Sequence, residues 1–202
     1  MTAHAPSWFD TAFEGQRVMV ILRGRPPAQT VELCHRAWDL GITQVEVPVQ
    51  SPDAVPSLVA AVAAGAERGH GVGAGTVTTL DQLNEVAEIG VSFTVAPGLD
   101  DDVVRWSQEH GLPHLPGVST PSEIQRAVRH GLGWVKAFPA SVLGTGWFTA
   151  MRGPFPTLRT VATGGMTVAT VVEYRDAGAR VVSLGSALDD PAQVEELARL
   201  LG

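Results

Sequence analysis

The 202-residue sequence contains little lysine, cysteine or tyrosine, and it has no excess of positive charge. Its formal net charge of −7 leaves no basic stripe that could follow a phosphate backbone or an anionic lipid surface, which argues against nucleic acid and membranes as partners. The single cysteine, Cys34, excludes an internal disulfide and is more typical of a small buried side chain than of a nucleophile. A small molecule is therefore the expected partner.

Long hydrophobic runs are also missing. Nowhere do 18 apolar residues follow one another, and residues 1–10 have neither a positive region nor a long apolar segment. We therefore expect no export signal or membrane anchor, and a cytoplasmic protein. With 45% hydrophobic residues, 22 glycines and 14 prolines, the composition predicts one domain over residues 1–202 with many tight turns.

Lys136 is the only lysine, and the other thirteen basic side chains are all arginine. It lies in the apolar run Gly-Trp-Val-Lys-Ala-Phe-Pro, residues 133–139. An arginine keeps its proton in a protein, whereas a lysine in apolar surroundings can lose its proton and become a nucleophilic amine. The run thus predicts a lysine that forms a Schiff base with a carbonyl substrate. The alternative is a lysine at a strand end whose ammonium group reaches solvent.

Short β-branched runs alternate with longer helix-like stretches from residue 17 onward. The eight predicted strands are 18–22, 44–47, 71–74, 92–96, 113–115, 134–137, 160–162 and 181–184. The helices expected between and after them are 28–40, 52–68, 80–89, 101–110, 121–130, 144–151, 168–177 and 191–201. Because hairpin signals are absent, this α/β pattern predicts a (β/α)8 TIM barrel with an additional N-terminal helix over residues 8–13. A doubly wound open sheet is the competing fold.

A barrel of this kind carries its chemistry where the strands end and the following loops begin. Reading the sequence at those positions gives one set of candidates: Arg23, Glu46, Thr76, Pro97, Ser119, Thr120, Lys136, Phe138, Thr163 and Ser186.

Glu46 interrupts an apolar run over residues 45–49. A lone buried carboxylate is costly unless it is paired or protonated. Beside an imine-forming lysine, a carboxyl group with a raised pKa would move protons to and from the reacting atoms. The alternative is a glutamate at a strand end that pairs with an arginine.

Glycine-containing loops follow the seventh and eighth predicted strands, at Thr163-Gly164-Gly165 and Gly185-Ser186. Barrels commonly bind phosphate with these two loops, because bare backbone amides can point at an oxyanion. Each loop alone is also explained by an ordinary turn. The segment 73–76, Gly-Ala-Gly-Thr, has the same two interpretations.

The acidic run Asp100-Asp101-Asp102 opens a predicted helix, which favours capping over catalysis. The six histidines are scattered, and no cysteine or carboxylate cluster has ligand spacing. We therefore predict no metal site.

Taken together, these motifs resemble the class I 2-keto-3-deoxy-6-phosphogluconate (KDPG) aldolase family, which includes 4-hydroxy-2-oxoglutarate (KHG) aldolases and 6-phosphogalactonate relatives. The resemblance runs in register over residues 17–188. The matching segments are Val-Glu-Val at 45–47, Gly-Ala-Gly-Thr-Val at 73–77, Ala-Pro-Gly-Leu at 96–99, Pro-Gly-Val-Ser-Thr at 116–120, Lys-Ala-Phe-Pro-Ala at 136–140, Gly-Pro-Phe-Pro at 153–156, Thr-Gly-Gly at 163–165 and Gly-Ser at 185–186.

The resemblance implies a homotrimeric (β/α)8 aldolase that needs no metal or other cofactor. Its implied reaction cleaves a 2-keto-3-deoxy-6-phosphosugar acid to pyruvate and glyceraldehyde 3-phosphate. Lys136 matches the Schiff-base lysine and Glu46 matches the general acid/base. The remaining matched positions are Thr76, Pro97 and Phe138 around pyruvate, and Gly164, Gly165, Gly185 and Ser186 around the phosphate.

One position departs from the family pattern. Many members have an arginine four residues after the catalytic glutamate, where it holds the pyruvate carboxylate, and this sequence has Gln50 there. We hypothesise that Arg23 holds the carboxylate instead, since a guanidinium can bind a carboxylate through two hydrogen bonds.

The segments 21–24 and 48–52 resemble the 6-phosphogalactonate branch, whereas Thr163 resembles the gluconate side at a position associated with stereochemical choice at C4. The substrate epimer thus stays open, as does a phosphate-free substrate such as 4-hydroxy-2-oxoglutarate. A phosphosugar epimerase or isomerase, and a non-catalytic metabolite-binding barrel, are the alternatives from other functional classes.

Overall fold

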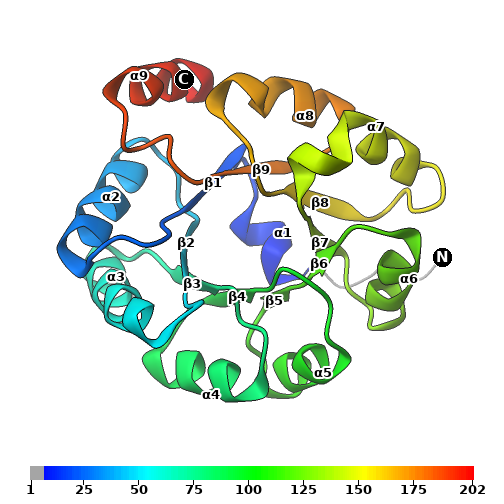
Figure 1. Cartoon of the computed structure of the whole chain (residues 1–202), viewed down its shortest axis with the longest axis horizontal. Helices are drawn as coiled ribbons and strands as arrows, with labels where there is room; N and C mark the ends of the chain where they lie inside the picture. The colour runs from blue at the N-terminus through cyan, green and yellow to red at the C-terminus, as the bar shows by residue number, and fades with distance from the viewer. Residues whose placement is uncertain (1–6) are drawn as a thin grey trace.

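A ring of parallel strands forms the centre of the molecule, and helices surround it (Figure 1). The computed structural model describes residues 7–202. The strands are β1 (Val18–Ile21), β2 (Val45–Pro48), β3 (Val72–Gly75), β4 (Phe93–Val95), β5 (His114–Leu115), β6 (Gly117–Val118), β7 (Trp134–Ala137), β8 (Arg159–Ala162) and β9 (Val181–Leu184). Their order in the sheet is β5-β4-β3-β2-β1-β9-β8-β7-β6, and every described pairing is parallel.

The ring closes through an interrupted fifth strand. The single strand predicted at 113–115 is followed by Pro116 and a second short piece, β6. β5 pairs with β4 and β6 pairs with β7, while the Pro116 carbonyl still accepts a hydrogen bond from the Lys136 backbone N–H at 2.9 Å. Because proline has no N–H to donate, the strand divides there without opening the barrel. The predicted (β/α)8 barrel is confirmed, and the open sheet is excluded.

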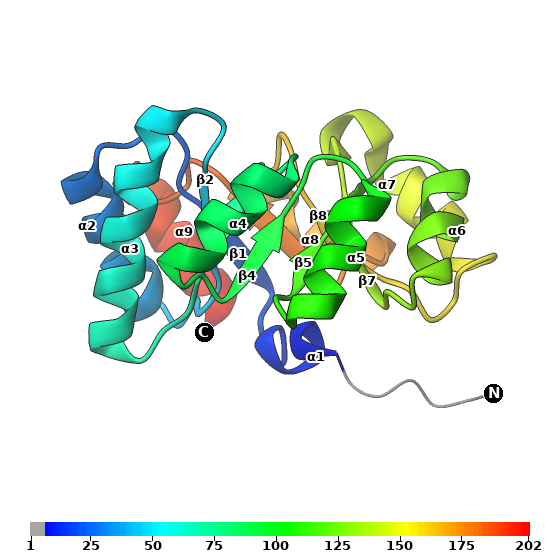
Figure 2. The same cartoon turned by 90° about the horizontal axis from the view of Figure 1, so that it is seen from below.

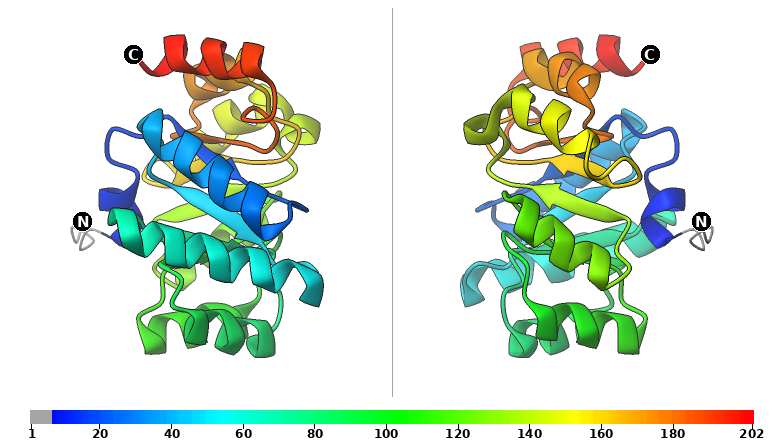
Figure 3. Two further views of the ribbon diagram at one scale, coloured as in Figure 1. Left: turned by 90° about the vertical axis from the view of Figure 1, so that its left-hand side faces the viewer. Right: turned by 90° about the vertical axis from the view of Figure 1, so that its right-hand side faces the viewer.

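The outer helices are α2 (Pro27–Asp39), α3 (Val55–Arg68), α4 (Leu80–Ile89), α5 (Asp101–His110), α6 (Pro121–Arg129), α7 (Ala140–Arg152), α8 (Val171–Ala177) and α9 (Pro191–Leu201). Short 3-10 turns, η1 (Pro52–Ala54) and η2 (Val168–Thr170), precede α3 and α8. The two side views show this layer of helices around the strands (Figure 3). Capping explains several boundaries. Thr120 and Glu123 form a reciprocal capping box at the start of α6, and Gly90 ends α4 in the left-handed conformation.

The short helix predicted over 144–151 begins earlier, at Ala140. Gly144 has φ 70° and ψ 166°, so two helical pieces meet there at a kink. The pattern of the sequence identified only the second piece, because a glycine in this conformation breaks the helical periodicity.

The additional N-terminal helix is α1 (Trp8–Ala12), and it covers the end of the barrel where the strands begin (Figure 2). Phe9 and Phe13 are buried in one cluster with Phe93 and Trp134. The Phe13 and Trp134 rings lie 5.0 Å apart, and Asp10 accepts a 2.8 Å hydrogen bond from the Trp134 indole N–H. Aromatic packing and this hydrogen bond hold α1 across the barrel floor.

Cys34 is fully buried in α2, as predicted, and burial raises the pKa of its thiol to about 12. Within residues 7–202, no helix has both the length and the apolar character that crossing a bilayer would require. The cytoplasmic location stays a prediction.

Candidate active site

Lys136 and Glu46 come from opposite parts of the ring, and both lie inside it. Lys136 is the third residue of β7 and is 2% exposed, while Glu46 is the second residue of β2 and is 0% exposed. Side chains alternate across a strand, so Lys136 shares the inward side with Trp134, whose ring packs against α1. The buried setting that the sequence predicted for these two groups is confirmed.

The electrostatic setting favours the neutral forms of both groups. Burial lowers the pKa of Lys136, and Arg23 acts in the same direction while Glu46 opposes it. Burial raises the pKa of Glu46, against the effects of Lys136 and Arg23. Both carboxyl oxygens of Glu46 are buried without a hydrogen-bond partner among the described residues. An uncompensated carboxylate there is unfavourable, so the proton tends to stay on Glu46 and to leave Lys136.

A glycine provides the space that Glu46 occupies. A Cβ atom at Gly75 would lie 1.8 Å from Glu46 Oε1, which no packing could accommodate without moving the carboxyl group. Gly73 and Gly75 were considered as part of an anion cradle, but the structure gives Gly75 a different role. It lets a buried carboxyl group enter the barrel interior from the adjacent strand.

Arg23, Gln50 and Thr76 meet above this buried pair. Each follows a strand end, after β1, β2 and β3 respectively. Arg23 donates hydrogen bonds of 3.4 Å to Gln50 Oε1 and of 3.4 Å to Thr76 Oγ1. Thr76 has φ 60°, which turns the chain at the end of β3. The guanidinium is exposed at the mouth and acts electrostatically on both Lys136 and Glu46.

Phe138 and Pro97 lie near Lys136 on either side. The Lys136 Nζ atom is 5.1 Å from the centre of the Phe138 ring. Gly117 is the register partner of Lys136, and a Cβ atom at Gly117 would lie 2.1 Å from the Pro97 carbonyl oxygen. Three strand ends thus bring these side chains around the amine.

Thr163 follows β8 directly and is buried, and its hydroxyl donates a 3.0 Å hydrogen bond to Ser183 Oγ. Sequence reasoning missed Ser183. The alternation of β9 could have found it, because Ser183 lies two residues before Gly185 and therefore shares its side of the strand.

The two predicted phosphate loops lie side by side, since β8 and β9 are neighbours in the sheet. Gly164 and Gly165 have φ values of 97° and 74°, so both occupy a conformation that favours glycine. Gly165, Gly185 and Ser186 are exposed. No contact described here joins these loops to Lys136, so their role in binding phosphate stays a prediction.

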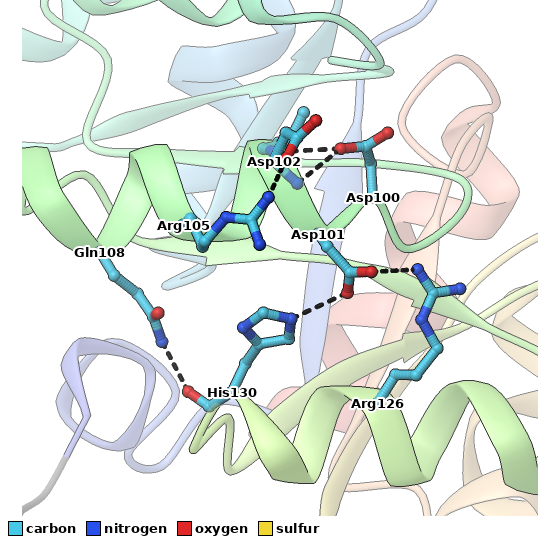
Figure 4. A network of polar contacts seen from close by, with 8 residues as sticks. Asp100, Asp101, Asp102, Arg105, Gln108, Arg126 and His130 are labelled. Atoms are coloured by element: carbon cyan, nitrogen blue, oxygen red, sulfur yellow. Dashed lines mark hydrogen bonds and ion pairs between the residues drawn. The ribbon is translucent and has the colours of Figure 1, made fainter.

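The acidic run lies outside this site (Figure 4). Asp100 caps α5 by accepting hydrogen bonds from the backbone N–H groups of Asp102 and Val103, as expected. Asp101 instead contacts α6, where it accepts hydrogen bonds from Arg126 at 2.6 Å and from His130 at 2.8 Å. This pairing between helices was not predicted, because it depends on the packing of α5 against α6.

Metal ligands do not gather anywhere in residues 7–202, where no three His, Cys, Asp or Glu side chains form a candidate metal group. The prediction that the reaction needs no metal or other cofactor still requires a biochemical test.

Comparison with known proteins identifies a family. The family model described as "Aldolase: KDPG and KHG aldolase" matches residues 10–200. A probable 2-dehydro-3-deoxy-6-phosphogalactonate aldolase of Rhizobium meliloti is 36% identical over 175 residues, covering 86% of this chain and 82% of the relative. A 2-dehydro-3-deoxy-phosphogluconate aldolase of Treponema pallidum is 35% identical over 187 residues, covering 90% and 86%.

Solved structures agree with the sequence comparison. The KDPG aldolase of Legionella pneumophila, with pyruvate captured at low pH as a covalent carbinolamine intermediate, superposes with a TM-score of 0.81. It is 25% identical in sequence, and the match covers 94% of each chain.

Proposed function

Because the chain belongs to the KDPG and KHG aldolase family, an aldehyde-lyase family, we propose that it cleaves a 2-keto-3-deoxy-6-phospho-aldonate through a Schiff base on Lys136. The observation that carries this proposal is the single lysine, buried inside the barrel with its pKa lowered, near a buried carboxyl group with a raised pKa. A neutral amine can attack a ketone, and a protonated carboxyl group can donate the proton that the attack requires.

The first half of the reaction builds an electron sink. The Nζ lone pair of Lys136 attacks the C2 carbonyl carbon, and the carbonyl oxygen takes up a proton to give a carbinolamine. Glu46 then protonates this hydroxyl group so that it leaves as water and a protonated imine forms. Burial supports this role, because it keeps the Glu46 proton available at neutral pH.

The second half breaks the carbon skeleton. The C4 hydroxyl loses its proton, the C3–C4 bond breaks, and the electron pair of that bond moves toward the imine nitrogen to give an enamine and an aldehyde. The enamine is protonated at C3, and water hydrolyses the resulting imine to release pyruvate and the free amine. Each proton is returned, so Glu46 can act first as an acid and then as a base.

Arg23 is proposed to hold the substrate carboxylate. Its guanidinium contacts Gln50, which occupies the usual arginine position, and it also contacts Thr76, at a position matched to the pyruvate site. The positive charge lies close enough to influence Lys136 and Glu46. We propose that Pro97, Phe138 and Thr163 shape the pocket, and that the Gly164-Gly165 and Gly185-Ser186 loops bind the phosphate.

The test of the Schiff base uses the fact that there is only one lysine. The full-length protein is mixed with pyruvate, reduced with borohydride, and analysed by intact mass and peptide mapping. One pyruvate adduct on the peptide containing Lys136 is expected, and Lys136→Met is the matched control that should show none. An adduct only at the terminal amine, or none, would contradict the lysine mechanism and leave an epimerase, an isomerase or a metabolite-binding barrel.

Arg23 is tested separately by Arg23→Gln. We expect the concentration of pyruvate needed for half-maximal trapping to rise about tenfold, because a charge-assisted hydrogen bond to the carboxylate is lost. Arg129→Gln is the matched control, since Arg129 is exposed on α6. Equal pyruvate affinity in the two variants would show that Arg23 does not bind the carboxylate.

The substrate epimer is tested with the gluconate and galactonate forms of the keto-acid phosphate, and with 4-hydroxy-2-oxoglutarate, at equal concentrations. The gluconate form is our first candidate on the basis of Thr163. The galactonate form is the second, because Gln50 and the 36% identical relative favour it. The homotrimer implied by the family resemblance also stays a prediction, which sedimentation of the full-length protein would test.

A further inference from the structure

Four arginine side chains gather at the end of the barrel opposite the proposed active site. Arg17 precedes β1, Arg180 precedes β9 and Arg159 begins β8, and these three strands are neighbours in the sheet. Arg175 comes from α8, the helix that leads into β9. Since the amino ends of parallel strands meet at one end of a barrel, residues far apart in the sequence come together there. All four border a cavity of about 800 Å³ beside α1, at the end seen in Figure 2.

Positive charge in this cavity is only partly compensated. Arg159 pairs with Asp10, whose carboxylate also binds the Trp134 indole. Across residues 7–202, Arg17, Arg175 and Arg180 have no carboxylate within ion-pair distance. Together with Glu14, which also borders the cavity, the lining has four guanidinium groups against two carboxylates, a formal excess of two positive charges.

Arg175 carries a second sign of an incomplete site. Its Nε atom is buried and has no hydrogen-bond acceptor among the described residues. Burial lowers the pKa of Arg175, and the neighbouring Arg17 and Arg180 lower it further, while Asp176 acts in the opposite direction. Arg17 is anchored by a 2.9 Å hydrogen bond to the Leu200 carbonyl on α9. Like charges are thus held close together on rigid elements, with a donor left unsatisfied.

We propose that this cavity binds a phosphate-like dianion, either inorganic phosphate or the phosphoryl group of a small phosphate monoester. Two negative charges would neutralise the excess charge of the lining. Guanidinium groups match the geometry of a phosphate because each can donate two parallel hydrogen bonds to its oxygens. The site is separate from the loops at Gly164 and Ser186, which follow the carboxyl ends of β8 and β9.

The test measures binding of inorganic phosphate and of glycerol 3-phosphate to the full-length protein by calorimetry at low ionic strength. A Ser186→Asp background places a carboxylate in the predicted phosphate loop and so reduces binding at the catalytic end. In that background, Arg180→Gln and Arg175→Gln should each weaken binding about tenfold or more, because each removes a charged donor. Arg129→Gln removes the same charge from α6 and should leave the affinity unchanged.

Two arms identify the source of the dianion. Tighter binding of glycerol 3-phosphate than of inorganic phosphate would identify a monoester site, and the reverse order would identify a site for free phosphate. Equal affinities in all three arginine variants would overturn the proposal. Light scattering supplies the other contrary outcome, in which Arg180→Gln changes the oligomeric state but not phosphate binding, so that the arginines belong to an interface. None of these outcomes depends on Lys136 forming a Schiff base.

Discussion

The two ends of the barrel interior use opposite side-chain chemistry. Toward the amino ends of the strands, Phe93 and Trp134 pack with Phe9 and Phe13 of α1 in an apolar cluster. Toward the carboxyl ends, the interior contains a buried lysine and a buried glutamate, with glycine where space is needed. The comparison teaches that one closed sheet can support stable packing at one end and tolerate costly buried polar groups at the other.

Lys136→Met is the change at the reactive end with the largest expected effect. Aldolase turnover should fall about a thousandfold or more, because no amine remains to form the imine. Stability should be maintained or increased, since methionine fills the space without a group that can be charged. Turnover and urea unfolding measure these two effects. Lys136→Arg is the informative companion, because it buries a permanent charge and should unfold at lower urea concentration than Lys136→Met. Near-normal turnover in Lys136→Met would remove the distinction between the two ends.

Phe93→Ala tests the packed end. Phe93 is fully buried, and its ring fills the space above Gly73 on the adjacent strand. The free energy of unfolding should fall by about 3–5 kcal/mol, because a large cavity replaces the ring. The folded fraction should still form the pyruvate adduct. Val59→Ala is the control, since Val59 is exposed on α3. A cost below about 1 kcal/mol would show that the apolar cluster contributes less than its burial suggests.

Gly75→Ala tests how tightly the two ends are joined. The added methyl group would displace the Glu46 carboxyl group, so we expect a loss of about 1–3 kcal/mol in the free energy of unfolding. Turnover should fall as well, because Glu46 leaves its position. Gly133→Ala is the matched control, since a Cβ atom there meets nothing within 4 Å. If the two variants unfolded at the same urea concentration and turned over equally fast, Gly75 would not be needed to make room for Glu46.

Glu46→Gln should have the smallest effect on stability, and its sign depends on pH. The pKa of Glu46 lies above its ordinary value of 4.5 in the folded protein, so the folded state holds more protons than the unfolded state over that interval. The free energy of unfolding therefore falls as pH rises from 4.5 to the folded pKa. Glutamine removes this slope, so the variant should gain stability relative to the parent protein as the pH rises from 4.5 to about 7.

This pH experiment is cleanest in a Lys136→Met background, where the lysine no longer titrates. Urea unfolding across the pH range compares the Lys136→Met protein with the double variant that also carries Glu46→Gln. A difference in stability that stays constant from pH 4.5 to about 7 would mean that burial does not raise the pKa of Glu46. In the enzyme with Lys136, the same Glu46→Gln change should slow turnover by about 100-fold to 10,000-fold, because a general acid and base is lost.

Much of this protein was determined locally by its sequence. The strand and helix alternation predicted the barrel, since periodicity follows from which side chains must face the core. Lys136 and Glu46 were predicted because a charged residue inside an apolar strand has few explanations. Capping residues such as Thr120 predicted helix starts from hydrogen bonds made within a single turn.

Only the tertiary structure decided which of these residues meet. The contacts of Arg23 with Gln50 and Thr76, the hydroxyl pair of Thr163 and Ser183, and the space that Gly75 leaves for Glu46 join different strands. The arginine cluster at the opposite end likewise depends on three strands becoming neighbours. Local patterns encode the periodicity and the caps of each element, whereas distances between side chains on different strands are fixed only when the ring closes.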